Sequence, residues 1–172
     1  MKLFLDTADV KEIEKRLSSG LISGITTNPT LIRKSGRNPQ DVYKELRDLG
    51  LTDISMEIVA DTEEELFSRA IGHAKEYGDI ATIKLPCSVD GLKACKRLSD
   101  LNVRTNVTLI FSVSQAILAS LAGATYISPF IGRMDDNSLD GMKLINDISN
   151  ALTGNTKILA ASIRDPQSVG TA

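Results

Sequence analysis

One lysine stands inside an apolar stretch, where lysine is seldom found unless it is paired or has a chemical task. Lys84 belongs to Ile80–Pro86, a short apolar run that is typical of a buried strand and ends at a proline. Burial disfavours the charged form of an amine, and a neutral amine is a nucleophile that can form a Schiff base with a carbonyl compound. Lys84 is therefore a candidate nucleophile. The structural alternative is that its aliphatic stem packs while the ammonium group reaches water at the strand end.

Six further segments share this design of a short apolar run, a polar residue near its carboxyl end and then a helical pattern. They are Lys2–Asp6, Ser23–Asn28, Asp53–Ile58, Val103–Thr108, Thr125–Phe130 and Lys157–Ser162. The runs start roughly every 20 to 32 residues, which fits repeated βα units of about 30 residues. The sequence therefore predicts strands that alternate with helices and pair in a parallel sheet.

Alternation along these strands separates a polar face from an apolar face, because successive side chains point to opposite sides. The polar face holds Ser55 with Glu57, Thr82 with Lys84, and Asn106 with Thr108. In a parallel barrel this face is the interior, and chemistry takes place at the carboxyl-terminal rim. An open doubly wound sheet is the alternative, but its strands are apolar on both faces. We therefore expect an α/β fold of the TIM (β/α)8 barrel type.

Capping patterns indicate where the helices begin. A helix is expected after Thr7, and another covers Asp90–Leu101. An apolar stripe at Leu139–Leu152 predicts a helix near the end of the chain. Other predicted starts lie at Pro39, at Thr62 with Glu65, at Ser112 with Gln115, and at Asp165 with Pro166.

Composition narrows the class of protein. The 172 residues, 42% of them hydrophobic, suffice for one core, so we expect a single domain over residues 1–172. A net charge of −2 gives no field that favours nucleic acid, and no apolar run approaches the ~20 residues of a membrane span. The two cysteines form neither a disulfide framework nor a zinc pattern. No signal peptide opens the chain, so we expect a cytoplasmic protein.

The length conflicts with a complete barrel, which usually needs at least ~200 residues. Only seven strands are predicted, and the chain stops at Ala172. We therefore expect the eighth strand and the C-terminal helices to be missing from this chain.

Six motifs resemble the transaldolase family, in the short form that includes the fructose-6-phosphate aldolases. They are Phe4–Ala8, Thr26–Ile32, Ile83–Pro86, Asn106–Ser112, Ile127–Arg133 and Ala161–Arg164. The resemblance implies a Schiff-base enzyme that needs no cofactor, acts on sugar phosphates and forms homo-oligomers.

The resemblance also implies roles for individual residues. Lys84 matches the Schiff-base lysine, Asp6 the residue that shuttles a proton, and Glu57 with Thr108 the pair that activates a water molecule. The implied substrate-binding residues are Asn28 and Ser128 at the hydroxyl groups, Phe130, and Arg133, Ser162 and Arg164 at the phosphate.

Three functions remain open. A transaldolase would move a dihydroxyacetone unit from sedoheptulose 7-phosphate to glyceraldehyde 3-phosphate in the pentose phosphate pathway. An aldolase of the family would release dihydroxyacetone, but such enzymes tend to carry glutamine and tyrosine where this chain has Glu57 and Phe130. A truncated barrel with little or no activity is the third hypothesis.

Structural roles compete with several of these assignments. Asp6 with Thr7 is a plausible helix cap, and Asn28 before a proline is typical of a turn. Glu57 with Lys84 has the composition of a buried ion pair, and Arg133 lies in sequence beside two aspartates. We assign the only histidine, His73, to the surface or the margin of the core.

Overall fold

The computed structural model describes residues 1–172, and the chain forms two compact units. Unit 1 comprises residues Met1–Ile58 and Arg69–Ile83, and unit 2 comprises Val59–Ser68 and Lys84–Ala172. The prediction of one domain over the whole chain stays a prediction.

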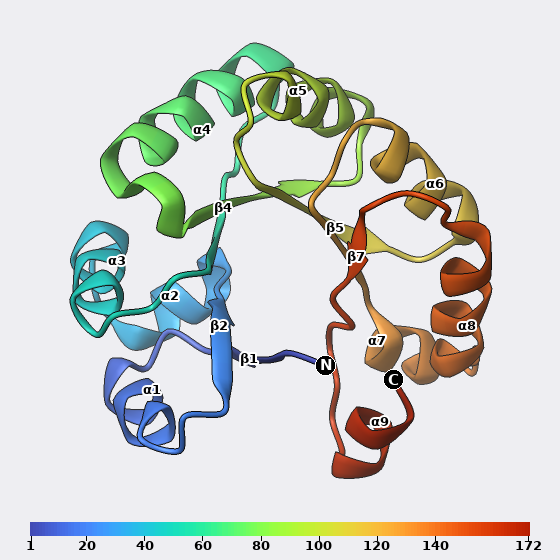
Figure 1. The fold of residues 1–172 in the computed structure, drawn as a ribbon, viewed down its shortest axis with the longest axis horizontal. Helices are drawn as coiled ribbons and strands as arrows, with labels where there is room; N and C mark the ends of the chain where they lie inside the picture. Colours follow the sequence, from blue (N-terminus) through green and yellow to red (C-terminus); the bar gives the residue numbers. More distant parts are fainter. The chain divides into compact units, whose positions relative to one another are not determined.

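Strands and helices alternate along both units (Figure 1). Unit 1 contains β1 (Leu3–Asp6), α1 (Val10–Leu17), β2 (Ile22–Thr26), α2 (Pro29–Ser35), α3 (Pro39–Asp48) and β3 (Ile54–Glu57). Unit 2 contains α5 (Val89–Asp100), β5 (Thr105–Ile110), α6 (Val113–Leu121), β6 (Tyr126–Pro129), α7 (Ile131–Asp136), α8 (Gly141–Ala151), β7 (Lys157–Ile158) and α9 (Pro166–Thr171). Helix α4 (Glu63–Tyr77) and strand β4 (Ala81–Pro86) contribute residues to both units, and the short 3-10 helix η1 (Gly78–Ile80) connects them.

The spatial order of the strands, β1 to β7, is their order in the chain. Strand β1 pairs with β2, β2 with β3, β5 with β6 and β6 with β7, and all four pairings are parallel. The predicted parallel α/β fold is thus confirmed. A doubly wound sheet is excluded, because its strand order reverses at a switch point.

Strand register brings polar residues of each unit to the same level. In unit 1, Asp6 lies opposite Thr26, and Thr26 lies opposite Ser55. In unit 2, Asn106 lies opposite Tyr126, and Tyr126 lies opposite Lys157. Helices α5 and α6 pack against β5, and α6 also packs against β6.

Both faces of the central strands are removed from water. The apolar positions Ile54, Ile83 and Val107 are fully buried, and so are the polar positions Thr82 and Asn106. Burial of polar side chains is costly unless they are hydrogen-bonded. The polar face therefore has to find its partners inside the protein or in a ligand.

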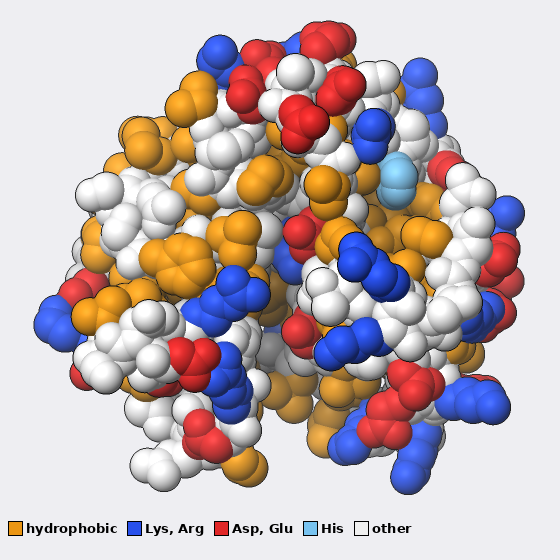
Figure 2. Space-filling model, turned by 180° about the vertical axis from the view of Figure 1, so that it is seen from behind, with side chains coloured by type: hydrophobic (Ala, Val, Ile, Leu, Met, Phe, Trp, Pro, Cys, Tyr) orange, Lys and Arg blue, Asp and Glu red, His pale blue; other side chains and the backbone are white.

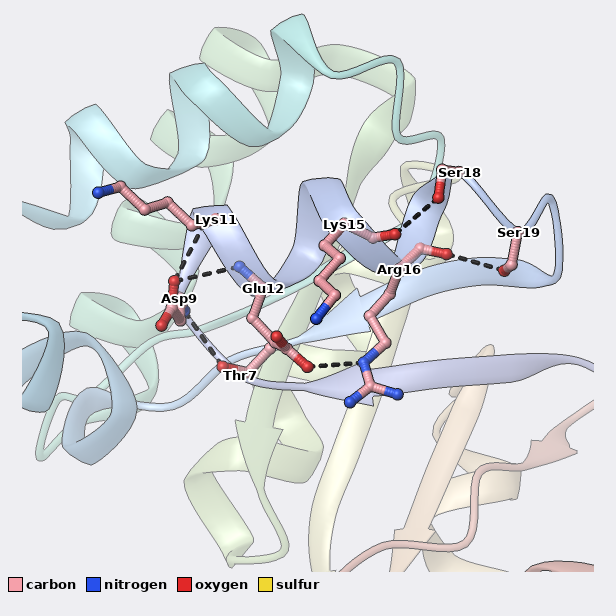
Figure 3. Close-up of polar contacts among 8 residues, drawn as sticks. All are labelled: Thr7, Asp9, Lys11, Glu12, Lys15, Arg16, Ser18 and Ser19. Carbon is pink, nitrogen blue, oxygen red and sulfur yellow. Dashed lines mark hydrogen bonds and ion pairs between the residues drawn. The ribbon is translucent and has the colours of Figure 1, made fainter.

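Local polar contacts fix the ends of α1 (Figure 3). Asp9 caps the helix, since its Oδ1 accepts from the backbone N–H groups of Lys11 and Glu12. Thr7, predicted to open this helix, instead accepts through Oγ1 from the Asp9 N–H at 3.1 Å. One turn later Arg16 donates through Nε to Glu12 at 2.6 Å.

Two short helices were not predicted. Asn28 does more than make a turn, because its side chain caps α2 and Pro29 occupies the first helical position. Helix α7 follows β6 directly and begins without a side-chain cap, so no capping pattern in the sequence predicts it. The predicted helix starts at Pro39, at Ser112 and at Asp165 with Pro166 are confirmed.

Surface charges of both signs are interspersed on the face seen in Figure 2. That mixture fits the near balance of 20 basic and 22 acidic residues. None of the helices has the length and apolar character needed to cross a membrane.

Candidate functional site

Strand β4 holds Lys84 almost entirely out of water. Lys84 is 5% exposed, although it carries an amine, and Ile83 and Leu85 on either side of it are fully buried. This placement suits an amine that has to act as a nucleophile.

Strands β5 and β6 of unit 2 supply three buried polar side chains. Ser128 Oγ donates to Asn106 Oδ1 at 2.8 Å, and both residues are buried. Thr108 is 1% exposed, and its Oγ1 has no hydrogen-bond partner in the protein. Such a group is uncommon in folded proteins. The Thr108 hydroxyl is thus available to a ligand or a water molecule.

The backbone next to Thr108 is irregular. Leu109 has a φ of 61°, in the left-handed region that bulky residues rarely occupy. The register between β5 and β6 shifts between Val107 and Ile110, and the Thr108 carbonyl accepts from the Cys87 N–H at 3.0 Å. Strained backbone of this kind clusters at functional sites. The sequence offered no sign of it.

Unit 1 holds two predicted catalytic residues, Asp6 and Glu57, and one predicted substrate-binding residue, Asn28. Asp6 is exposed at the end of β1, where its Oδ1 accepts from Thr26 Oγ1 at 2.8 Å. The Asn28 side chain accepts from the Leu31 N–H at 2.9 Å and is thereby used as a helix cap. Glu57 is half-buried at the end of β3.

A buried phenol lies beside these groups in unit 1. Thr27 Oγ1 donates to the Ser55 carbonyl at 2.9 Å, so the Tyr43 hydroxyl, 3.1 Å away, donates to Thr27. Burial raises the pKa of Tyr43, the Thr27 hydrogen bond opposes this shift, and the charge of Glu57 adds to it. Tyr43 is consequently a neutral hydrogen-bond donor at physiological pH.

Three of the predicted substrate-binding residues surround the start of α7. Phe130 precedes the helix and contacts the Phe111 ring, with 5.9 Å between the ring centroids. The Arg133 guanidinium lies 5.3 Å from the centroid of the Phe130 ring. Ser162 is half-buried and has a φ of 61°. Two of these side chains are thus in contact, and the third belongs to the loop that crosses α7.

Arg164 is engaged by a carboxylate that was not among the predicted site residues. It donates through Nη1 and Nη2 to the two carboxylate oxygens of Asp136. Arg164, and to a lesser degree Arg133, hold the pKa of Asp136 below its ordinary value. The structural alternative for Arg133 was a pair with a neighbouring aspartate, but Asp136 binds Arg164.

Two other side chains that could be reactive, Cys87 and His73, lie in surroundings that favour a structural role. Burial raises the pKa of the Cys87 thiol, which leaves less of the nucleophilic thiolate. His73 is half-buried among Tyr43 and Tyr77, and its Nδ1 lies 3.1 Å from the Arg69 carbonyl oxygen. The position of His73 agrees with its predicted place at the margin of the core.

The structure thus places Lys84, Thr108, Ser128, Phe130, Arg133, Ser162 and Arg164 in unit 2, and Asp6, Asn28 and Glu57 in unit 1. Sequence reasoning missed Thr26, Asn106 and Asp136 as partners of these residues. Alternation put Asn106 on the same face as Thr108, and this was the one available signal. The contacts of Thr26 and Asp136 join residues 20 and 28 positions apart, which no local pattern reveals.

Comparison with known proteins places the chain in a family. Residues 3–172 match the family model described as Transaldolase/Fructose-6-phosphate aldolase. A probable transaldolase of Anaeromyxobacter sp. (strain Fw109-5) is 51% identical over 169 residues, which make up 96% of this chain and 78% of that protein. Probable transaldolases of Geobacter sulfurreducens and Nitrosopumilus maritimus are 47% and 46% identical over 96% and 98% of this chain, and the match covers 78% of each.

One solved structure supports the fold alone. A mandelate oxidase mutant with a monooxide FMN adduct superposes with a TM-score of 0.64 at 11% identity. The match covers 99% of this chain and 59% of that one. The family assignment itself depends on sequence: the chain belongs to the transaldolase/fructose-6-phosphate aldolase family.

Proposed function

We propose that this protein is a transaldolase that moves a dihydroxyacetone unit from sedoheptulose 7-phosphate to glyceraldehyde 3-phosphate. The observation that carries the proposal is the burial of Lys84, which is 5% exposed on a strand of polar and apolar alternation. The names of the relatives support the same reaction. The proposed setting is the pentose phosphate pathway in the cytoplasm.

Lys84 is the proposed nucleophile. Its neutral Nζ adds to the ketose carbonyl carbon, and loss of water then gives a protonated imine. The bond between the α and β carbons of the imine then breaks, and the imine accepts its electron pair. An aldose leaves, and an enamine stays on the lysine. The enamine adds to the carbonyl carbon of the acceptor aldose, and hydrolysis of the new imine frees the product and the amine.

Asp6 is the proposed acid and base of the carbon–carbon step. It takes the proton from the substrate hydroxyl as the bond breaks and returns a proton to the new hydroxyl as the acceptor adds. Thr26, whose hydroxyl donates to Asp6 Oδ1 at 2.8 Å, would orient that carboxylate.

Glu57 and Thr108 are proposed to hold the water molecule that imine formation releases and hydrolysis consumes. The buried Thr108 hydroxyl supports this role, since it has no partner in the protein and one ordered water would satisfy it. Asn28 and Ser128 are proposed to contact the substrate hydroxyl groups.

Arg133, Ser162 and Arg164 are proposed to bind the phosphate group. Arginine suits this task because its planar fork matches phosphate oxygens. The Arg133→Ala variant should raise KM for a phosphorylated ketose about tenfold, as expected for one charge-assisted contact, and change the reaction of an unphosphorylated ketose little. Steady-state kinetics with the two substrates provide the check; equal losses for both would remove Arg133 from the phosphate site.

An aldolase that releases free dihydroxyacetone is the second candidate, since the family description names both activities. Phe130 disfavours it, because a phenylalanine ring has no proton to give to the enamine carbon. The enamine should therefore persist until an aldose accepts it. Glu57 fits the transaldolase pattern in the same way.

A transfer assay separates the two activities. With both sugar phosphates present, the three-carbon unit should convert the three-carbon acceptor into a six-carbon ketose phosphate and leave a four-carbon aldose phosphate. Free dihydroxyacetone should form far more slowly when the acceptor is omitted. Release of dihydroxyacetone as fast as the transfer reaction would establish the aldolase. If neither product forms, the protein is inactive.

The architecture and assembly that accompany this proposal are a (β/α)8-type barrel and a homo-oligomer. Parallel strands in sequential order support the barrel, because a barrel of βα units is built in that order. Light scattering of the purified protein measures the oligomeric state.

A further inference from the structure

The Arg164 side chain is held at two places along helix α7. Its Nη1 and Nη2 donate to the two oxygens of Asp136, with 2.6 Å between Nη2 and Oδ2. Its Nε lies 3.0 Å from the position that a Cβ atom on Gly132 would occupy. Residues four apart lie on the same side of a helix. Gly132 and Asp136 therefore form one surface beneath the guanidinium.

Gly132 is required by this close approach. A Cβ atom there would lie 2.1 Å from the Ser162 carbonyl oxygen and 3.0 Å from Ser162 Oγ. The segment is fastened to the helix start by the Ile131 N–H, which donates to the Ala161 carbonyl at 3.1 Å. Any side chain at position 132 would displace backbone that also carries Ser162 and Arg164.

Asp136 occupies only part of the guanidinium. An arginine side chain has five N–H donors, and the carboxylate uses one on each terminal nitrogen. The Nε–H and the second N–H of each terminal nitrogen are not used by Asp136. The side chains of Arg164 and Asp136 are 54% and 49% exposed, so a ligand reaches them from solvent.

The ion pair between Arg164 and Asp136 adds little to the free energy of unfolding, because exposed ion pairs contribute little stability. Its effect on geometry is larger, since the fork of a free arginine samples many rotamers. A carboxylate that accepts hydrogen bonds from both terminal nitrogens fixes the plane of the guanidinium and the direction of its unused N–H groups.

We propose that Gly132 and Asp136 are positioning residues that hold the Arg164 guanidinium ready to bind the phosphate group of a sugar phosphate. The inference rests on the proposed function, in which Arg164 contacts phosphate. Asp136 acts through Arg164 and does not touch the substrate. On this account the carboxylate assists the anion site although its own charge is negative.

The test measures the Kd of inorganic phosphate by calorimetry for the full chain and its variants. Asp136→Ala should weaken binding about five- to tenfold, the size expected when one arginine must be ordered by the ligand itself. Asp136→Asn keeps one acceptor oxygen, so its Kd should lie between those of the wild type and Asp136→Ala. Asp147→Ala is the matched control, because it removes another exposed ion pair of unit 2, with Lys143, and should change Kd less than about twofold.

A double-mutant cycle shows whether Asp136 acts through Arg164. Arg164→Ala should weaken binding at least as much as Asp136→Ala, and the double variant should be no weaker than Arg164→Ala alone. Unchanged or tighter binding by Asp136→Ala, additive losses in the double variant, or no phosphate binding by the wild type would each overturn the inference.

Failure of the proposed function is distinguishable from failure of this inference. Phosphate binding does not need Lys84, so the expected pattern of Kd values together with no covalent adduct on Lys84 would reject the transaldolase and retain the anion site. Gly132→Ala should also weaken phosphate binding, and thermal melting shows whether this variant folds. If it does not fold, the Asp136 variants alone test the inference.

Discussion

Buried polar side chains near the beginnings of the strands differ from Thr108, which lies farther along its strand. At the beginnings, Thr82 Oγ1 donates to Asp53 Oδ1 at 2.7 Å, and Thr105 Oγ1 lies 3.3 Å from Cys95 Sγ. Farther along β5, the Thr108 hydroxyl is equally buried but has no partner in the protein. The first group completes the core. Thr108 has an unsatisfied hydroxyl group, which is the state expected where a ligand or water is to be bound.

The largest effect is expected at Lys84. Lys84→Ala should lower turnover about a thousandfold or more, because no other side chain would form the covalent intermediate. Lys84→Met keeps most of the side-chain volume without the amine, and it should melt no lower than the wild type, because a buried amine costs solvation energy. Transfer assays and thermal melting measure the two properties. Turnover by the folded Met variant would remove the Schiff-base role.

Thr108→Val should separate activity from stability. The change removes an unpartnered buried hydroxyl, so the free energy of unfolding should stay the same or rise. Turnover should fall about a hundredfold, as expected when a group that assists proton transfer is lost. Denaturant unfolding and transfer assays provide the measurements.

Tyr77→Phe is the matched control for Thr108→Val. The Tyr77 hydroxyl is likewise buried and without a hydrogen-bond partner, but it lies at the end of helix α4. Its removal should leave turnover unchanged. Similar losses of turnover in both variants would show that an unsatisfied hydroxyl does not mark the site.

Thr82→Val should show the opposite behaviour. The change removes the hydrogen bond that Thr82 donates to the buried Asp53 carboxylate, so the free energy of unfolding should fall by about 1–3 kcal/mol. Turnover of the folded fraction should stay near that of the wild type. A variant that keeps its stability but loses turnover would contradict the structural role assigned to the beginnings of the strands.

The smallest effect concerns alkaline pH. Burial, and then the charge of Glu76, raises the pKa of Tyr77 to about 12. The unfolded phenol ionises near pH 10, so the contribution of Tyr77 to the free energy of unfolding should be constant below that pH and fall between about 10 and 12. Denaturant unfolding across this range measures the fall. Tyr77→Phe should flatten it, and an equal slope in both proteins would count against the shifted phenol.

Much of the fold could be predicted because it has local causes. Alternation located the strand that carries Lys84, and the capping residues Ser112 and Asp165 located α6 and α9. Errors arose where local rules compete. Thr7 and Asp9 are both good caps, and the structure uses Asp9. Leu139 fits the stripe of α8 but lies before the helix and is 54% exposed.

The candidate site could be predicted as a set of residues but not as contacts. Thr26 meets Asp6 through strand register, and Asp136 meets Arg164 through the loop that crosses α7. Both contacts depend on packing between distant segments. The left-handed backbone at Leu109 is also tertiary in origin, because its sequence neighbours give no turn signal.

Reduction with borohydride in the presence of a ketose phosphate tests the central claim most directly. Mass spectrometry of the digested protein should find the reduced three-carbon adduct on the peptide that carries Lys84, and no adduct in the Lys84→Met variant. A folded wild-type protein that gives no adduct, or an adduct on another lysine, would contradict the account.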